Sequence, residues 1–179
     1  MSTTTLGIVL AAGSGQRYGV PKVTAANGYW LECAVNALAG GGISKILVAL
    51  GAAVVPVPAP STPLVVTDWR RGLSATVTAA VHAAQADADV ETLVLHTVDT
   101  PTIDAAVVER VLTTGRSGLV RAVYHGRPGH PVLIARRYWD ELLQNLSGDT
   151  GAGPFLASHP DLVRVECSDL AGGEDIDEE

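Results

Sequence analysis

The residues best suited to chemistry lie near the start of the chain, in a glycine-rich loop that follows an apolar run. The loop contains Gly13, Gly15 and Gly19, together with Arg17 and Lys22. Glycines allow backbone N–H groups to turn inward around an anion, and the arginine and lysine add full positive charge to the same concavity. Because the chain has only two lysines and one lies here, we predict that the loop binds a phosphate, and its two cations favour a triphosphate.

Two other kinds of glycine-rich loop fit the sequence less well. A dinucleotide-binding loop reads G-x-G-x-x-G and is followed, about 20 residues later, by an acid at the end of the second strand. Here the third glycine comes one residue late, and the second apolar run, residues 45–51, ends without an acid. A Walker loop requires a Gly-Lys-Ser/Thr ending, which is missing. A turn that is simply rich in glycine, with no ligand, stays open as an alternative.

Carboxylates form the second group of candidate residues. Asp99 follows the apolar run 92–97 and precedes Pro101. A carboxylate at a buried strand end costs desolvation energy unless a cation meets it, and hard divalent metals prefer such oxygen ligands. Capping of the following helix is the alternative role for Asp99. The acidic residues 174–179 at the end of the chain, considered alone, are typical of a solvated and disordered tail.

Further polar residues also follow expected strands. Ser74 lies at the start of a helical pattern, where it either caps the first turn or donates to a ligand at the helix N-terminus. His130 lies in a glycine-proline turn, where a structural role is the common one. Cys33 and Cys167 are far apart and lack the spacing of metal ligands, so neither a disulfide scaffold nor a zinc site is predicted.

Apolar runs and helical patterns alternate along the chain and must position these residues. Strands are expected at residues 6–11, 45–50, 64–67, 92–97, 118–124, 131–135 and 162–166, and helices at 29–39, 72–86, 102–114, 136–146 and 150–157. This alternation predicts an α/β fold of three layers, α/β/α, around a mostly parallel twisted sheet. Ligands of such sheets bind at the carboxyl ends of the strands, where the candidate residues lie.

The composition limits the class of protein. The chain has 179 residues, which favours a single domain over residues 1–179, with 47% hydrophobic and 17% charged residues. Its net charge of −7 and its lack of a basic cluster argue against nucleic acid as a partner. No apolar run has the length of a membrane span or the flanks of a signal peptide, so we expect a cytoplasmic protein without a membrane partner.

The first loop, LAAGSGQRYGVPK, resembles the signature loop of the molybdenum cofactor nucleotidyltransferases. That family is a branch of the nucleotidyltransferases with a Rossmann-like, glycosyltransferase-A-like fold. The resemblance implies that the loop holds a nucleoside triphosphate and that Arg17 and Lys22 take part in catalysis. The residues of this loop that are then expected to bind the nucleotide are Leu10, Ala11, Ala12, Gly13, Gly15, Arg17 and Lys22.

Two later segments resemble the family's substrate-binding motifs. A Trp-x-x-Gly-x-Ser segment is similar to its second motif, which implies that Gly72 and Ser74 bind the nucleotide near its base. A Gly-His-Pro segment and a Gly-Asp-Thr-Gly-Ala turn are similar to motifs that border the acceptor pocket. The resemblance therefore implies that His130, Asp149 and Gly151 bind the acceptor.

The metal-binding motifs of the family also have counterparts here. Asp99 in Asp-Thr-Pro is similar to a catalytic, metal-binding aspartate, and Asp175 and Asp177 resemble an aspartate pair that shares the same metal. The implied cofactor is Mg²⁺. Gly153 stands where the family often has an arginine, and the helix that usually follows the aspartate pair is missing. The first departure concerns the identity of the acceptor, and the second concerns how firmly Asp175 and Asp177 are held as metal ligands.

The resemblance implies nucleotidyl transfer from a nucleoside triphosphate to a small anionic acceptor, with release of pyrophosphate. The Leu10–Gly13 segment is similar to the cytidylyl branch of the family, which favours CTP over GTP and a molybdopterin-type acceptor. Phosphoenolpyruvate, phospholactate or a sugar phosphate are alternative acceptors. A nucleotide-binding module without catalysis, and a dehydrogenase-like cofactor binder, are hypotheses of a different kind.

Overall fold

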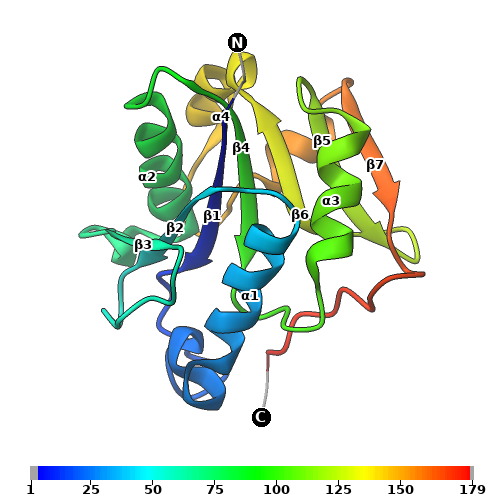
Figure 1. Ribbon diagram of the computed structural model, residues 1–179. Coiled ribbons are helices and arrows are strands. Elements are labelled where there is room, and N and C mark those ends of the chain that lie inside the picture. The colour runs from blue at the N-terminus through cyan, green and yellow to red at the C-terminus, as the bar shows by residue number, and fades with distance from the viewer. Residues whose placement is uncertain (1–3, 178–179) are drawn as a thin grey trace.

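A seven-stranded sheet carries the fold (Figure 1), and the computed structural model describes residues 4–177. The strands are β1 (Thr4–Ala11), β2 (Lys45–Leu50), β3 (Thr62–Val65), β4 (Val90–Thr97), β5 (Leu119–Tyr124), β6 (Arg127–Ala135) and β7 (Leu162–Glu166). They lie in the order β3-β2-β1-β4-β6-β5-β7. All neighbouring pairs are parallel except those of β6, which runs antiparallel to β4 and β5. The predicted α/β fold with a mostly parallel sheet is confirmed.

A tight turn explains the single antiparallel strand. His125 and Gly126 join β5 to β6, and both have positive φ angles, of 51° and 75°. A two-residue hairpin with positive φ at both positions matches the right-handed twist of the strands. Because β6 is antiparallel to both of its neighbours, β4 and β5 run in the same direction. The carboxyl ends of β1, β4 and β5 therefore all lie at the same edge of the sheet.

Helices cover both faces of the sheet (Figure 1). The helices are α1 (Tyr29–Gly40), α2 (Leu73–Gln85), α3 (Ala105–Thr114), α4 (Trp139–Asn145) and α5 (Gly153–Ser158), with short 3₁₀ helices at η1 (Lys22–Gly28), η2 (Trp69–Arg71) and η3 (Arg136–Tyr138). One core joins α1 and α3 to the sheet, and a second joins α2, α4 and α5 to its other face. Both cores are built mainly from Val, Leu, Ile and Ala. No helix within residues 4–177 has the length and apolar character needed to cross a bilayer.

Several boundaries differ from the sequence-based expectation. Helix α3 begins at Ala105 rather than at 102, because the Asp104 side chain accepts hydrogen bonds from the backbone N–H groups of Ala106 and Val107. Asp99 is therefore not the cap of this helix. Strand β3 starts at Thr62 and includes Pro63, which is tolerated because β3 is an edge strand. Strand β6 is longer than expected and contains the whole Gly-His-Pro segment.

His96 on β4 provides a test of the core. Its side chain is completely buried, and neither ring nitrogen has a hydrogen-bond partner in the described chain. Burial, and to a lesser degree the nearby His130, lowers the pKa of His96 to about 3. Since the unfolded chain takes up this proton near pH 6.5, stability conferred by neutral His96 is complete above that pH and falls as the pH drops toward 3.

Replacing His96 with leucine is therefore expected to flatten the acid side of the stability profile. At pH 5 the histidine costs about 2 kcal/mol relative to neutral pH, and the leucine variant lacks this cost. Urea unfolding at pH 7 and pH 5 measures the difference. His82→Gln, on the exposed face of α2, is the matched control. An unchanged pH dependence in His96→Leu would contradict the burial of an uncharged imidazole.

Candidate active site

A cavity of about 680 Å³ opens at the carboxyl edge of the sheet, between the ends of β1 and β4 and the start of α2. Thirteen of the residues predicted from the motifs line it: Leu10, Ala11, Ala12, Gly13, Gly15, Arg17, Lys22, Gly72, Asp99, His130, Asp149, Asp175 and Asp177. They come from segments that are far apart in the sequence and meet only in the folded sheet. This cavity is the candidate active site.

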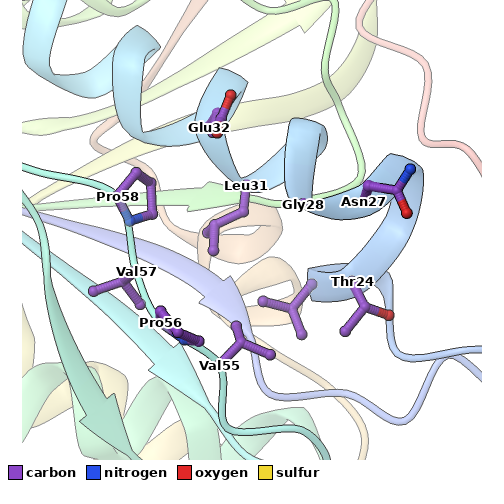
Figure 2. A pocket seen from close by; sticks show the side chains of 10 residues that line it. Thr24, Asn27, Gly28, Leu31, Glu32, Val55, Pro56, Val57 and Pro58 are labelled. Carbon is purple, nitrogen blue, oxygen red and sulfur yellow. The ribbon is translucent and has the colours of Figure 1, made fainter.

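A second hollow, of about 580 Å³, lies between the start of α1 and the segment 55–58 (Figure 2). Leu31 points into it from α1, and valines and prolines form the opposite wall. Its lining includes one acid, Glu32, and neither lysine nor arginine. Such a lining repels a phosphate, and none of the predicted site residues contributes to it.

The glycine loop has a conformation that depends on two of its glycines. Gly15 has a φ of +64°, and a Cβ atom there would lie 1.8 Å from the carbonyl oxygen of Val20. Gly19 also has a positive φ, of 96°, and its N–H donates to the Gly15 carbonyl at 2.8 Å. The loop therefore folds back on itself before Lys22 begins η1. This turn places the cation beside the carboxyl end of β4.

Lys22 lies at the centre of the charged groups of the cavity. Its Nζ donates to Asp99 Oδ2 and to Asp177 Oδ1, both at 2.8 Å. Arg17 Nη1 approaches the other oxygen of Asp177 at 3.7 Å. Burial opposes the charge on Lys22, but the hydrogen bonds that it donates to Asp177 and Asp99 outweigh this effect and raise the pKa of Lys22 above its ordinary value. The same hydrogen bond lowers the pKa of Asp177.

The C-terminal segment reaches the site because it packs against the sheet. The N–H of Ile176 donates to the carbonyl oxygen of Asp99 at 3.0 Å. The side chains of Leu170 and Ile176 contact the core beneath α1 and α3. Up to Asp177 the segment is therefore held on the sheet through Ile176, while the side chains of Glu174, Asp175 and Asp177 are exposed and positions 178 and 179 lie outside the described residues.

A glycine pair offers a test of this packing. Gly173 has a φ of +70°, and a Cβ there would lie 2.1 Å from the ring of Tyr124, whereas a Cβ on Gly172 meets nothing within 4 Å. Gly173→Ala is thus expected to detach the segment and carry Asp175 and Asp177 away from the cavity. Limited proteolysis should cleave the tail of this variant at least about tenfold faster than that of Gly172→Ala. Equal cleavage rates would contradict the packing.

The carboxylates provide oxygen ligands of the kind that hard divalent cations prefer. Asp99 Oδ1 is buried and has no hydrogen-bond partner within residues 4–177. Burial, followed by the negative charges of Asp99 and Asp177, raises the pKa of Asp175. Three or more His, Cys, Asp or Glu side chains do not converge to metal-binding distance in this part of the chain. Two of the three predicted metal ligands, Asp99 and Asp177, instead accept hydrogen bonds from Lys22, whose positive charge lies between them.

The start of α2 and the turn at 148–149 form the wall opposite β4. A Cβ on Gly72, whose φ is +103°, would lie 2.4 Å from the Gly148 carbonyl oxygen and 2.5 Å from Asp149 Oδ1. The N–H of Ser74 donates to the Gly148 carbonyl at 3.1 Å. Gly72, and not Ser74, is the N-cap of α2. The 148–149 turn thus covers the first turn of the helix.

Two predicted residues do not line the cavity, Ser74 and Gly151. The backbone of Ser74 is engaged by the turn over it. Gly151 packs on Leu73, since a Cβ there would lie 2.8 Å from Leu73 Cδ2. Their contribution is to hold the wall rather than to face the cavity.

His130 lies at the other side of the cavity, near the start of β6. Its carbonyl oxygen accepts a hydrogen bond of 2.6 Å from the Tyr124 hydroxyl. Burial, with the charge of Arg121, lowers the pKa of His130 to about 4. At neutral pH the ring is therefore uncharged and presents one donor and one acceptor.

The cavity also contains residues that were not among the predicted site residues. These are Ser14, Gln16, Trp69, Arg70, Leu73, Thr76, Thr97 and Val98. The Arg70 guanidinium stacks on Trp69, 4.7 Å from the ring centre, and adds a cation to the rim. The Trp-Arg-Arg sequence could have indicated such a cation. Thr76 is buried in the first turn of α2. Its position in the cavity wall depends on how the helix is oriented on the sheet, which the sequence alone does not indicate.

This combination of a glycine loop, cations and carboxylates at the carboxyl edge of an α/β sheet defines a nucleotide-binding protein of the transferase type. Residues 7–163 match the MobA-like NTP transferase domain, and the chain belongs to this family. It is 31% identical over 188 residues to nicotine blue oxidoreductase from Paenarthrobacter nicotinovorans, covering 96% of this chain and 91% of the relative.

Solved structures share the fold. Rv0371c from Mycobacterium tuberculosis H37Rv has a TM-score of 0.79 and 24% identity, covering 98% of this chain and 94% of the other. A manganese complex of the same protein has a TM-score of 0.66 and 21% identity, covering 93% and 90%. A nucleotidyl transferase from Methanothermobacter thermautotrophicus has a TM-score of 0.78 and 18% identity, covering 99% and 93%.

Proposed function

We propose that the protein transfers a nucleoside monophosphate, from CTP in preference to GTP, to a small anionic acceptor and releases pyrophosphate. The observation that carries this proposal is the position of Lys22. It links the glycine loop after β1 to Asp99 after β4 and to Asp177 of the C-terminal segment, with 2.8 Å hydrogen bonds to both carboxylates. The glycine loop and the three aspartates thus face one cavity, which supports nucleotidyl transfer.

In this reaction an oxyanion of the acceptor attacks the α-phosphorus of the triphosphate. The bond from that phosphorus to the bridging oxygen breaks, and pyrophosphate leaves with the bonding electrons. Lys22, Arg17 and the loop amides stabilise the negative charge that builds up on the leaving group. A phosphate monoester has a second pKa of about 6 and is largely a dianion at neutral pH, so the acceptor needs no general base.

Mg²⁺ is the proposed metal of this site, and the carboxylates, which do not converge to metal-binding distance within residues 4–177, would have to draw together around it. Asp99, Asp175 and Asp177 would hold it, and its charge would then neutralise the triphosphate and polarise the phosphorus. Asp99 Oδ1, which is buried and has no hydrogen-bond partner in residues 4–177, and the hard oxygen donors support this assignment. The manganese complex of Rv0371c supports a divalent metal in this fold. Lys22 would exchange its carboxylate partners for triphosphate oxygens.

The base and the acceptor are inferred from the motifs. The Leu10–Gly13 segment resembles the cytidylyl branch and favours CTP, and a molybdopterin-type phosphate is the proposed acceptor. Phosphoenolpyruvate, phospholactate and sugar phosphates are the alternatives. His130 and Asp149 both line the cavity, and we assign them to the acceptor side.

A pyrophosphate-release assay tests this function. The purified protein is incubated with CTP, GTP, ATP or UTP, with each acceptor class, and with or without Mg²⁺. Release that requires one nucleotide, one acceptor and the metal is the expected result. Nucleotide binding without release for any acceptor would favour a module that has kept the site but lost the chemistry.

A second candidate function is reduction of a small molecule by a nicotinamide cofactor. Its support is the 31% identity to a protein named nicotine blue oxidoreductase. The glycine spacing of the loop does not fit the usual dinucleotide fingerprint. Oxidation of NADH or NADPH on addition of nicotine blue, absent without the protein, would favour this candidate over nucleotidyl transfer.

A further inference from the structure

Two arginines stand directly opposite each other on neighbouring strands. Arg121 of β5 is in register with Arg164 of β7. The pair Leu119 and Leu162, two residues earlier on the same strands, packs into the core beneath α2, α4 and α5. Because side chains alternate along a strand, both arginines point to that same face of the sheet.

This pairing of two positive charges is expected to destabilise the sheet. Like charges directly opposite each other destabilise a sheet, and neither arginine forms an ion pair within residues 4–177. Glu166 is the nearest acid along β7, but its oxygens accept hydrogen bonds from the N–H groups of His125 and Gly126. Burial, followed by the charge of Arg164, lowers the pKa of Arg121. Asp175 offsets part of the charge of Arg121, but it forms no ion pair with either arginine among the described residues.

Arg121, one member of the pair, lies beside the cavity. Arg121 is half-buried, and its Nε donates to the carbonyl oxygen of Gly129 at 3.1 Å. Gly129 immediately precedes His130, which lines the cavity, and the charges of Arg121 and Asp175 influence each other. The Gly129 bond uses only one of the five N–H donors of the guanidinium. In the sheet, β6 and β4 separate the arginines from the glycine loop after β1.

We propose that Arg121 and Arg164 form a phosphate-binding subsite for the acceptor, on the side of the cavity opposite Lys22. Two guanidinium groups can bind a phosphate dianion through paired N–H bonds, and the anion cancels their repulsion. The identity of the bound molecule as the acceptor rests on the proposed function, whereas the affinity of this arginine pair for phosphate does not. The acceptor would then bridge the arginine pair and the α-phosphate at Asp99.

The test uses inorganic phosphate as the probe and the Lys22→Met background, in which the loop has lost its lysine. Thermal unfolding is followed with increasing phosphate, against chloride at equal ionic strength, since binding to the folded state raises the melting temperature. The added variants are Arg164→Gln, on the exposed side of the pair, and Arg121→Lys, which keeps the charge but loses the fork. Arg116→Gln, an exposed arginine before β5, is the control for net charge.

Arg164→Gln is expected to raise the melting temperature without phosphate and to weaken phosphate binding about tenfold, as for loss of a hydrogen bond to a charged group. Arg121→Lys should weaken binding while the protein remains folded, and Arg116→Gln should change neither quantity. Equal phosphate responses in Arg164→Gln and Arg116→Gln would overturn the subsite. Because this assay involves no nucleotide, its result is independent of whether nucleotidyl transfer is observed.

Discussion

Pyrophosphate release by the Asp99→Asn variant is expected to be on the order of 10³-fold slower than that of the unchanged protein. Asp99 is held just after β4 and accepts a hydrogen bond from Lys22 at 2.8 Å. Its second oxygen is buried and has no hydrogen-bond partner among the described residues. An amide has the same shape but no charge, so it removes a metal ligand and a partner of the lysine together. The measurement is steady-state turnover with the best nucleotide and acceptor.

Asp140→Asn on α4 is the control, since this exposed carboxylate accepts a hydrogen bond from Gln85, away from the cavity. Its turnover should equal that of the unchanged protein. Circular dichroism and thermal unfolding establish that Asp99→Asn remains folded. Full turnover in Asp99→Asn would place the chemistry elsewhere in the molecule.

Substitution of Gly15 by alanine is expected to weaken nucleotide binding on the order of 10²-fold. The methyl group would lie 1.8 Å from the Val20 carbonyl oxygen, and the φ of +64° is unfavourable for alanine. The loop must open to relieve this contact, and its amides and Lys22 then no longer face the same point. Calorimetric titration with CTP and Mg²⁺ measures the loss.

Gly13→Ala is the matched control for the loop, because a Cβ at Gly13 meets nothing within 4 Å. Its melting temperature should be unchanged, whereas Gly15→Ala should lose about 1–3 kcal/mol of stability. Any loss of nucleotide affinity in Gly13→Ala then reports contact with the ligand rather than a rearranged loop. Equal stability in the two variants would contradict the strained turn at Gly15.

Local patterns were sufficient to predict the order of strands and helices. The continuous apolar run of β1 and the helical spacing of α2 reflect burial, which acts residue by residue. The antiparallel direction of β6 depends on positive φ angles at His125 and Gly126. Histidine does not demand such an angle, so this reversal could not be predicted with the same certainty.

The site was predictable where a residue type carries the chemistry by itself. Gly13, Gly15, Lys22 and Asp99 are of this kind, and the structure brings them into one cavity. Ser74 and Gly151 do not line the cavity, because the Ser74 N–H donates to the Gly148 carbonyl and Gly151 packs on Leu73. The pairing of Arg121 with Arg164 depends on the register of two strands more than 40 residues apart, which no local pattern encodes.

Lys22 and the loop around it are expected to bind a nucleoside triphosphate together with a divalent metal. Isothermal titration of CTP and GTP, with and without Mg²⁺, into the unchanged protein, Lys22→Met and Lys45→Met tests it most directly. Lys45 is the only other lysine and pairs with Asp87, so it controls for loss of charge. The account predicts metal-dependent binding of one nucleotide, weakened on the order of 10²-fold in Lys22→Met and unchanged in Lys45→Met. Equal binding by the two variants, or binding of neither nucleotide to the unchanged protein, would contradict it.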